Sequence, residues 1–120
     1  MRLDHVQLCC PPGSDDLMRG FYVGVLGMVE EPKPPILAAR GGSWFRAGDA
    51  VVHTGVEGDF RPAHRAHPAF VVADLDELAR VLADAGCEVR WDDAIPGVRR
   101  LHTDDPVGNR LEFIQAGAAS

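Results

Sequence analysis

The sequence contains two copies of one strand pattern, and this repetition decides the fold. The first copy opens with LDHVQL (residues 3–8) and closes with AVVHT (residues 50–54). The second copy opens with AHPAFVV (residues 66–72) and closes with RLEFI (residues 110–114). Because self-similarity at a fixed period marks a repeated supersecondary unit, we expect the chain to consist of two equivalent modules.

Each copy places a histidine in its first strand and a side chain that can bind metal in its last. His5 and His67 open the copies, His53 and Glu112 close them, and both pairs are offset by about 60 residues. Duplication of one unit should bring four equivalent strand positions around a common axis. The spacing therefore indicates a metal site rather than a scatter of unrelated histidines.

Capping and breaking residues divide each copy into a strand, a helix and three further strands. Ser14 or Asp15 is expected to cap the first helix and Asp74 the second, while Gly27 and Gly86 end them. The proline-rich residues 32–35 suggest a loop or lid. The expected strands are residues 2–9, 28–31, 43–46, 50–56, 66–72, 87–91, 98–103 and 110–114.

Such a unit leaves one apolar sheet face uncovered and gains by packing with its twin. We therefore predict an α+β fold of two tandem βαβββ modules that form a curved mixed sheet around a cleft. Module one is expected at residues 1–57, a linker at 58–65 and module two at 66–116. With 120 residues, of which 46% are hydrophobic, the chain has the size and composition of a single domain.

The charge and composition disfavour several classes of partner. The chain has 12 basic and 18 acidic residues, and its net charge of −6 has the wrong sign for binding a phosphate backbone. No apolar run is long enough to span a membrane, and the N-terminus lacks the features of a signal peptide. We therefore expect no nucleic-acid or membrane partner and a cytoplasmic location, where Cys9, Cys10 and Cys87 would be reduced thiols.

Two motifs resemble those of the vicinal oxygen chelate superfamily, which includes glyoxalase I, fosfomycin- and bleomycin-resistance proteins and extradiol dioxygenases. The more diagnostic motif is DPVGNRLEF (residues 105–113), and the other is FYVGVLGM (residues 21–28) at the end of the first helix. The resemblance covers nearly the whole chain. It implies a glyoxalase-like fold and a homodimer, whose chains could exchange halves to complete each site.

The resemblance also implies that His5, His67 and Glu112 bind a metal ion. His53 stands where glyoxalase-like members add a fourth ligand, usually glutamate, so it is expected either to bind the ion or to contact a ligand or the substrate. Two or three imidazoles with one carboxylate suit Zn, Ni, Fe or Mn and do not single out one of them. The opposite strand face carries Val6 and Leu8 beside His5, Val52, Thr54 and Val56 beside His53, and Leu111 and Phe113 beside Glu112, as expected for strands whose other face lies against a core.

Arg100 and His102 precede Glu112 by even numbers of residues, so they share its strand face if the hairpin has no odd offset. We expect both to line the pocket and bind an anionic group of the substrate. The alternative is that Arg99 and Arg100 form an exposed pair on an edge strand. Asp105 is expected to shape a turn, without a catalytic role.

The resemblance implies a metal-dependent lyase or isomerase of the glyoxalase type that acts on a small oxygen-bearing substrate. A divalent transition metal would hold two substrate oxygens, and Glu112 could move protons as the catalytic residue. Two alternatives stay open: a dioxygenase, and a metal-free protein that sequesters a small molecule or antibiotic, as in the bleomycin-resistance branch.

Overall fold

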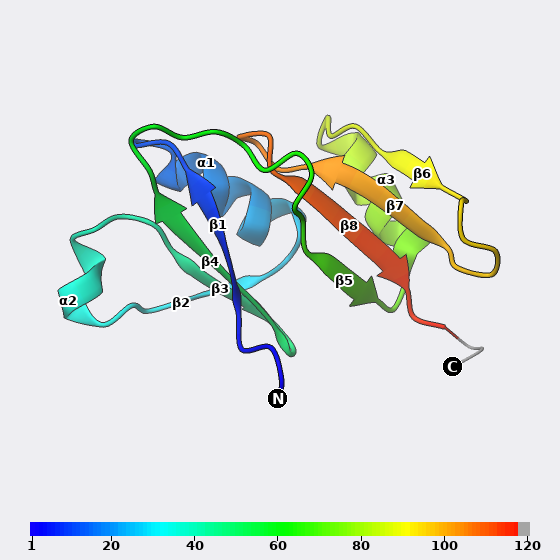
Figure 1. The fold of residues 1–120 in the computed structure, drawn as a ribbon, viewed down its shortest axis with the longest axis horizontal. Coiled ribbons are helices and arrows are strands. Elements are labelled where there is room, and N and C mark those ends of the chain that lie inside the picture. Colours follow the sequence, from blue (N-terminus) through cyan, green and yellow to red (C-terminus); the bar gives the residue numbers. More distant parts are fainter. Residues whose placement is uncertain (118–120) are drawn as a thin grey trace.

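Two βαβββ modules lie side by side in the computed structural model, which describes residues 1–117 (Figure 1). Module one contains β1 (Val6–Cys10), α1 (Asp15–Arg19), η1 (Gly20–Val25), β2 (Val29–Glu31), α2 (Pro35–Ala38), β3 (Trp44–Ala47) and β4 (Ala50–Val56). Module two contains β5 (Ala69–Val72), α3 (Leu75–Asp84), β6 (Arg90–Asp92), β7 (Arg100–Asp104) and β8 (Arg110–Gln115). The order of elements confirms the predicted α+β fold with two modules.

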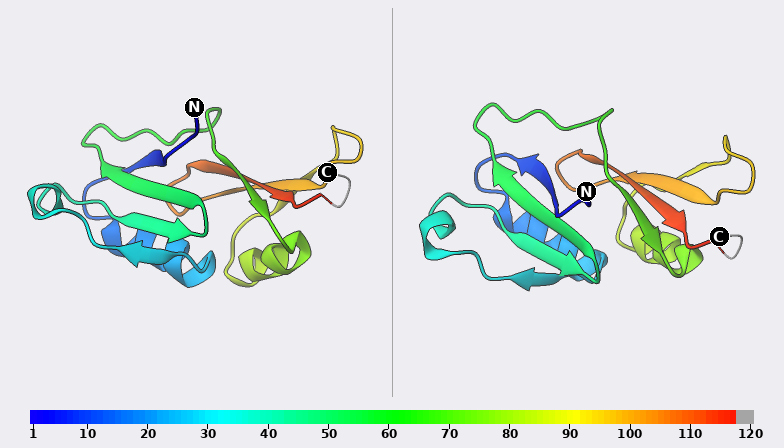
Figure 2. Two further views of the ribbon diagram at one scale, coloured as in Figure 1. Left: turned by 90° about the horizontal axis from the view of Figure 1, so that it is seen from below. Right: turned by 60° about the horizontal axis from the view of Figure 1, so that its bottom comes forward.

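Each module forms its own four-stranded mixed sheet, with strand orders β1-β4-β3-β2 and β5-β8-β7-β6. The opening and closing strands of each module pair in parallel, and the remaining pairs are antiparallel. The longer helices lie on the same side of both sheets and leave the opposite faces without a helix (Figure 2). Over the part of the chain that the structure describes, the strands thus form two sheets and not one continuous curved sheet.

The first helix differs from the prediction of a regular α-helix. After α1 the backbone widens into the π-helix η1, where the amide of Leu26 donates to the carbonyl of Phe21 at 2.9 Å. Two glycines, which are weak helix formers, lie in this segment. The hydroxyl of Ser14 donates to the carbonyl of Pro11 at 2.6 Å and does not cap the helix. Gly27 ends the segment with a φ of 74°, as predicted.

In module two the predicted helix caps are confirmed, but the first strand is shorter than predicted. The Asp74 carboxylate accepts from the amide of Glu77 at 3.1 Å, and Gly86 follows the helix with a φ of 83°. Strand β5 begins only at Ala69, because Pro68 has no N–H to donate to a ladder. The loop predicted at residues 32–35 ends at Pro35, which begins the short helix α2. No helix within residues 1–117 is long and apolar enough to cross a membrane.

The core lies between the helices and the sheets, and the strand parity predicted from the sequence is confirmed. Val52 and Thr54 are buried on either side of His53, and Leu111 and Phe113 are buried on either side of Glu112. The three cysteines are free thiols. The sequence alternation therefore correctly separates the core face of each sheet from the face that carries the candidate site residues.

A buried polar cluster joins the two modules at one end. Tyr22 donates to the Asp105 carboxylate at 2.8 Å, and Asn109 donates to the same carboxylate at 3.0 Å and to the carbonyl of Cys9 at 2.8 Å. The amide of Ala63 in the linker donates to the side-chain oxygen of Asn109 at 3.0 Å. This cluster ties β1, η1 and the linker to the turn before β8. The turn is predicted from the sequence, but its contacts with module one are not.

Candidate metal centre

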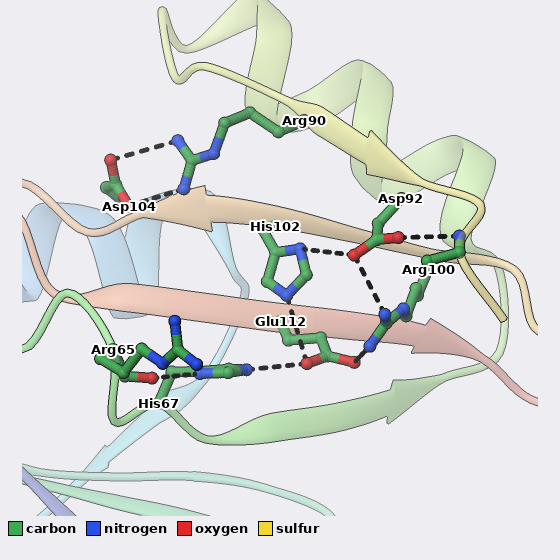
Figure 3. Close-up of polar contacts among 9 residues, drawn as sticks. Arg65, His67, Arg90, Asp92, Arg100, His102, Asp104 and Glu112 are labelled. Carbon is green, nitrogen blue, oxygen red and sulfur yellow. Dashed lines mark hydrogen bonds and ion pairs between the residues drawn. The ribbon is translucent and has the colours of Figure 1, made fainter.

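Three side chains of module two converge on the open face of its sheet (Figure 3). The Nε2 of His67 lies 2.8 Å from Glu112 Oε1, and the Nε2 of His102 lies 3.3 Å from the same oxygen. One ligand atom from each of the three residues falls within 4.8 Å of the other two. We call His67, His102 and Glu112 the metal group.

Strand pairing explains this convergence. Glu112 on β8 stands opposite His102 on β7 and opposite Ala69 on β5. His67 lies two residues before Ala69 and therefore reaches toward the same face of the sheet. The even offset predicted between His102 and Glu112 is confirmed, because the two residues are direct antiparallel partners.

The hydrogen bond at Nδ1 of the His67 ring determines whether Nε2 of the same ring can bind a metal ion. The Nδ1 of His67 lies 2.8 Å from the carbonyl oxygen of Arg65, which can only accept, so Nδ1 carries the proton. In a neutral ring Nε2 then bears a lone pair, and it faces a carboxylate oxygen of Glu112, which is also an acceptor. Such an arrangement requires either a proton or a cation between the two atoms. Two imidazole nitrogens and one carboxylate oxygen fit a divalent transition metal.

The protonation of the metal group favours the same interpretation. Burial acts to raise the pKa of Glu112, but the contacts with His67 and Arg100 and the charges nearby outweigh it, so the pKa lies below its usual value. Burial is the main cause that lowers the pKa of His102. At neutral pH the group thus presents an ionised carboxylate beside a neutral imidazole, which are the forms that bind metal.

Arg100 links the metal group to a second carboxylate. One guanidinium nitrogen lies 3.1 Å from Glu112 Oε2 and another lies 3.0 Å from Asp92 Oδ2. The Nε of Arg100 is buried and has no hydrogen-bond partner within residues 1–117. Asp92 also lies 3.9 Å from the Nδ1 of His102. No sequence pattern singles out Asp92, which the pairing of β6 with β7 places directly opposite Arg100.

The other two predicted ligands lie in module one and are not part of the metal group. The rings of His5 and His53 stack with their centroids 4.0 Å apart, and the indole of Trp44 stacks on the other face of His53 at 4.4 Å. Burial and the neighbouring His5 lower the pKa of His53. His64 in the linker is exposed. The predicted ligand roles of His5 and His53 stay predictions.

A cavity of about 880 Å³ borders both modules. His5 and its neighbours on β1 line one side, and His67 and the start of β5 line the other. One member of the metal group therefore reaches a space large enough for a small molecule. Typical small-molecule sites have volumes of roughly 300–1,000 Å³.

Comparison with solved structures identifies the class of the protein. The chain is 47% identical to a protein from Bacillus anthracis named as a glyoxalase family member, with a TM-score of 0.92 over 96% of this chain and 94% of that one. Lactoylglutathione lyase from Agrobacterium tumefaciens is 17% identical, with a TM-score of 0.71 over 92% of each chain. The fosfomycin resistance protein FosX from Listeria monocytogenes is 14% identical, with a TM-score of 0.76 over 99% of this chain and 96% of that one.

The chain belongs to the glyoxalase family of the vicinal oxygen chelate superfamily, as the identity and coverage of the first of these structures show. The other two share its fold at low identity. No protein-family model and no curated protein matches the sequence.

Proposed function

We propose that this protein is a metal-dependent enzyme of the glyoxalase type, a lyase or isomerase, that acts on a small oxygen-bearing substrate. The observation that carries the proposal is the convergence of the two imidazole nitrogens and the Glu112 carboxylate within 4.8 Å. His67, His102 and Glu112 would hold Zn, Ni, Fe or Mn. A bound divalent ion would supply Lewis-acid polarisation of a substrate oxygen.

The residues around the metal group have separate roles in this proposal. Glu112 is the candidate proton carrier, because its carboxylate reaches the open face of the sheet. Arg100 would bind an anionic group of the substrate through its guanidinium, which in the unliganded chain contacts Glu112 and Asp92 beside the metal group. His102, predicted to bind substrate, is assigned here to the metal. His5 borders the same cavity as His67 and is the further candidate ligand.

We also propose a homodimer, for which the edges of the two sheets provide support. Strands β1 and β5 each have one partner and leave one edge unpaired within the described residues 1–117. Val71 on β5 is 68% exposed, and Leu3 just before β1 is 83% exposed. Static light scattering coupled to size-exclusion chromatography tests this part: a single mass of one chain would contradict it.

A metal-free binding protein is the second candidate, and one observation favours it. Arg100 and His67 already contact the two oxygens of Glu112, so a protonated His67 and the guanidinium could balance the carboxylate without an ion. A dioxygenase stays open as an alternative reaction for a metal-bound site. Substrate screening of the metal-loaded protein separates the two reactions, because only the dioxygenase consumes O₂.

Metal content tests the proposal directly. The protein is purified without chelator, and its transition metals are measured by elemental analysis. About one equivalent per chain is expected, with loss in His67→Ala and Glu112→Gln and retention in the control His64→Ala, whose side chain is exposed in the linker. Wild-type protein that stays metal-free after reconstitution with each candidate ion would support the second candidate instead. His5→Ala and His53→Ala in the same assay test their predicted ligand roles.

A further inference from the structure

The guanidinium of Arg100 lies between two carboxylates from the strands on either side of its own (Figure 3). In the sheet order β5-β8-β7-β6, Arg100 is on β7, Glu112 on β8 and Asp92 on β6. One nitrogen of the guanidinium contacts Glu112 Oε2 and another contacts Asp92 Oδ2. Two carboxylates thus share one positive charge, so the position of the guanidinium relative to Glu112 depends on Asp92.

The two oxygens of Glu112 face different partners. Oε1 lies 2.8 Å from the Nε2 of His67 and 3.3 Å from the Nε2 of His102, whereas Oε2 lies 3.1 Å from Arg100. A guanidinium can also bind both oxygens of one carboxylate at once, through two parallel hydrogen bonds. In that arrangement Arg100 would cover Oε1, the oxygen that faces both imidazoles. The metal group therefore needs the guanidinium to stay on Oε2 alone.

The Asp92 carboxylate is anchored to the backbone and can hold the guanidinium in place. Its Oδ1 accepts from the amide of Ala94 at 2.9 Å, in the turn after β6. Its Oδ2 lies 3.0 Å from Arg100, which is its direct partner in the pairing of β6 with β7. The side chain of Arg100 is only 17% exposed, so solvent screens this ion pair less than a pair on the open surface.

We propose that Asp92 is a positioning residue of the metal group, which holds the guanidinium of Arg100 on Glu112 Oε2 and keeps Oε1 open for a metal ion. This role rests on the proposed function, because it concerns the same metal group. Without the Asp92 carboxylate, Arg100 would turn onto both oxygens of Glu112 and compete with the ion. Asp92 acts through Arg100 and needs no contact with the ion or the substrate.

The test measures the affinity of metal-free protein for Zn, Ni, Fe and Mn ions by isothermal titration. Asp92→Asn, which keeps the size of the side chain and removes its charge, should weaken binding at least about fivefold. Asp93→Asn is the matched control, since it removes the same charge from the next residue, whose side chain is exposed. The control should change the affinity by less than about twofold, because solvent and salt screen an exposed charge.

A second substitution separates positioning from a merely structural effect. In Arg100→Gln protein no guanidinium can cover Oε1, so adding Asp92→Asn should lower the affinity by less than about twofold. Asp92→Ser, which also lacks the carboxylate, should behave as Asp92→Asn does, with and without Arg100, and supplies the same comparison if Asp92→Asn does not fold. Circular dichroism of the metal-free variants shows whether each is folded.

The possible results distinguish this role from the proposed function. A loss of affinity that depends on Arg100 supports the role of Asp92. Equal losses with and without Arg100, or Asp92→Asn protein that binds an ion as tightly as wild type, would overturn the role of Asp92 alone. Wild-type protein that binds none of the four ions would overturn both.

Discussion

The phenol of Tyr22 in module one donates a hydrogen bond to the buried carboxylate of Asp105 in module two, at 2.8 Å. The two residues are 83 positions apart in the sequence. Asp105 Oδ1 accepts from the amides of Val107 and Asn109, so the same side chain shapes the turn and joins the modules. The position of module one relative to the metal group therefore depends on this cluster.

Tyr22→Phe should lower the free energy of unfolding by about 1.5–3 kcal/mol, the usual contribution of a buried hydrogen bond to a charged group. The substitution removes only the hydroxyl, and the ring keeps its stacking on Phe45. Urea unfolding followed by circular dichroism measures the change. A loss below about 0.5 kcal/mol would mean that water replaces the hydroxyl at Asp105.

The stability contributed by Asp105 should fall as the pH rises. Burial is the main cause that raises its pKa above the ordinary 3.8, even though its hydrogen bonds act in the opposite direction. The folded state therefore binds the proton more tightly than the unfolded state. The stabilisation is complete below pH 3.8, the ordinary pKa, and is lost as the pH rises through the raised pKa of the folded state. Asp105→Asn should remove this pH-dependent part of the unfolding free energy. The check is the difference in unfolding free energy between wild type and variant across an acid pH series.

A divalent metal should stabilise the fold through the metal group. At a free concentration of 100 times the dissociation constant, the expected gain is about 2.7 kcal/mol, and chelation should reverse it. Thermal unfolding with and without metal measures the effect. His67→Ala should show no gain, and an unchanged gain in that variant would place the ion elsewhere.

Arg100→Gln should raise the affinity for a divalent metal by at least about tenfold, because it removes a positive charge that contacts the carboxylate of Glu112. The same variant should bind anionic substrate analogues more weakly. Isothermal titration with metal, and then with analogue, measures both effects. Arg90→Gln is a matched control, since Arg90 pairs with Asp104 and Glu88 on the surface of the same sheet. Equal metal affinity in both variants would contradict the role of Arg100.

Gly42→Ala should destabilise the protein by about 3 kcal/mol or more, whereas Gly48→Ala should cost about 1 kcal/mol. Both glycines have a positive φ, so both substitutions strain the backbone. A Cβ at Gly42 would lie 2.0 Å from the carbonyl oxygen of Thr54, and one at Gly48 would meet nothing within 4 Å. Chemical denaturation of the two variants gives the comparison. Similar costs would show that the loop before β3 can move away from Thr54.

The sequence by itself determined the two modules, their strand order along the chain and the core face of each strand. Repetition and period-two alternation are local properties, and Leu111 and Phe113 are buried around Glu112 as the alternation requires. The sequence also placed His102 on the strand face of Glu112, on the condition that the hairpin has no odd offset, and the observed register meets that condition.

Only the tertiary structure decided which side chains meet. It brought His102 to His67 and Glu112, and it placed Asp92 beside Arg100 through the pairing of β6 with β7, a register that no local pattern encodes. In module one, His5 and His53 occupy the positions that His67 and Glu112 occupy in module two, yet the rings of His5 and His53 stack. The physical reason is that repeated sequence fixes equivalent backbone positions, whereas the contacts of the side chains depend on pairing and packing between segments that are distant in the chain. His67 meets Glu112, 45 positions away, in this way, and Asn109 meets Cys9, 100 positions away.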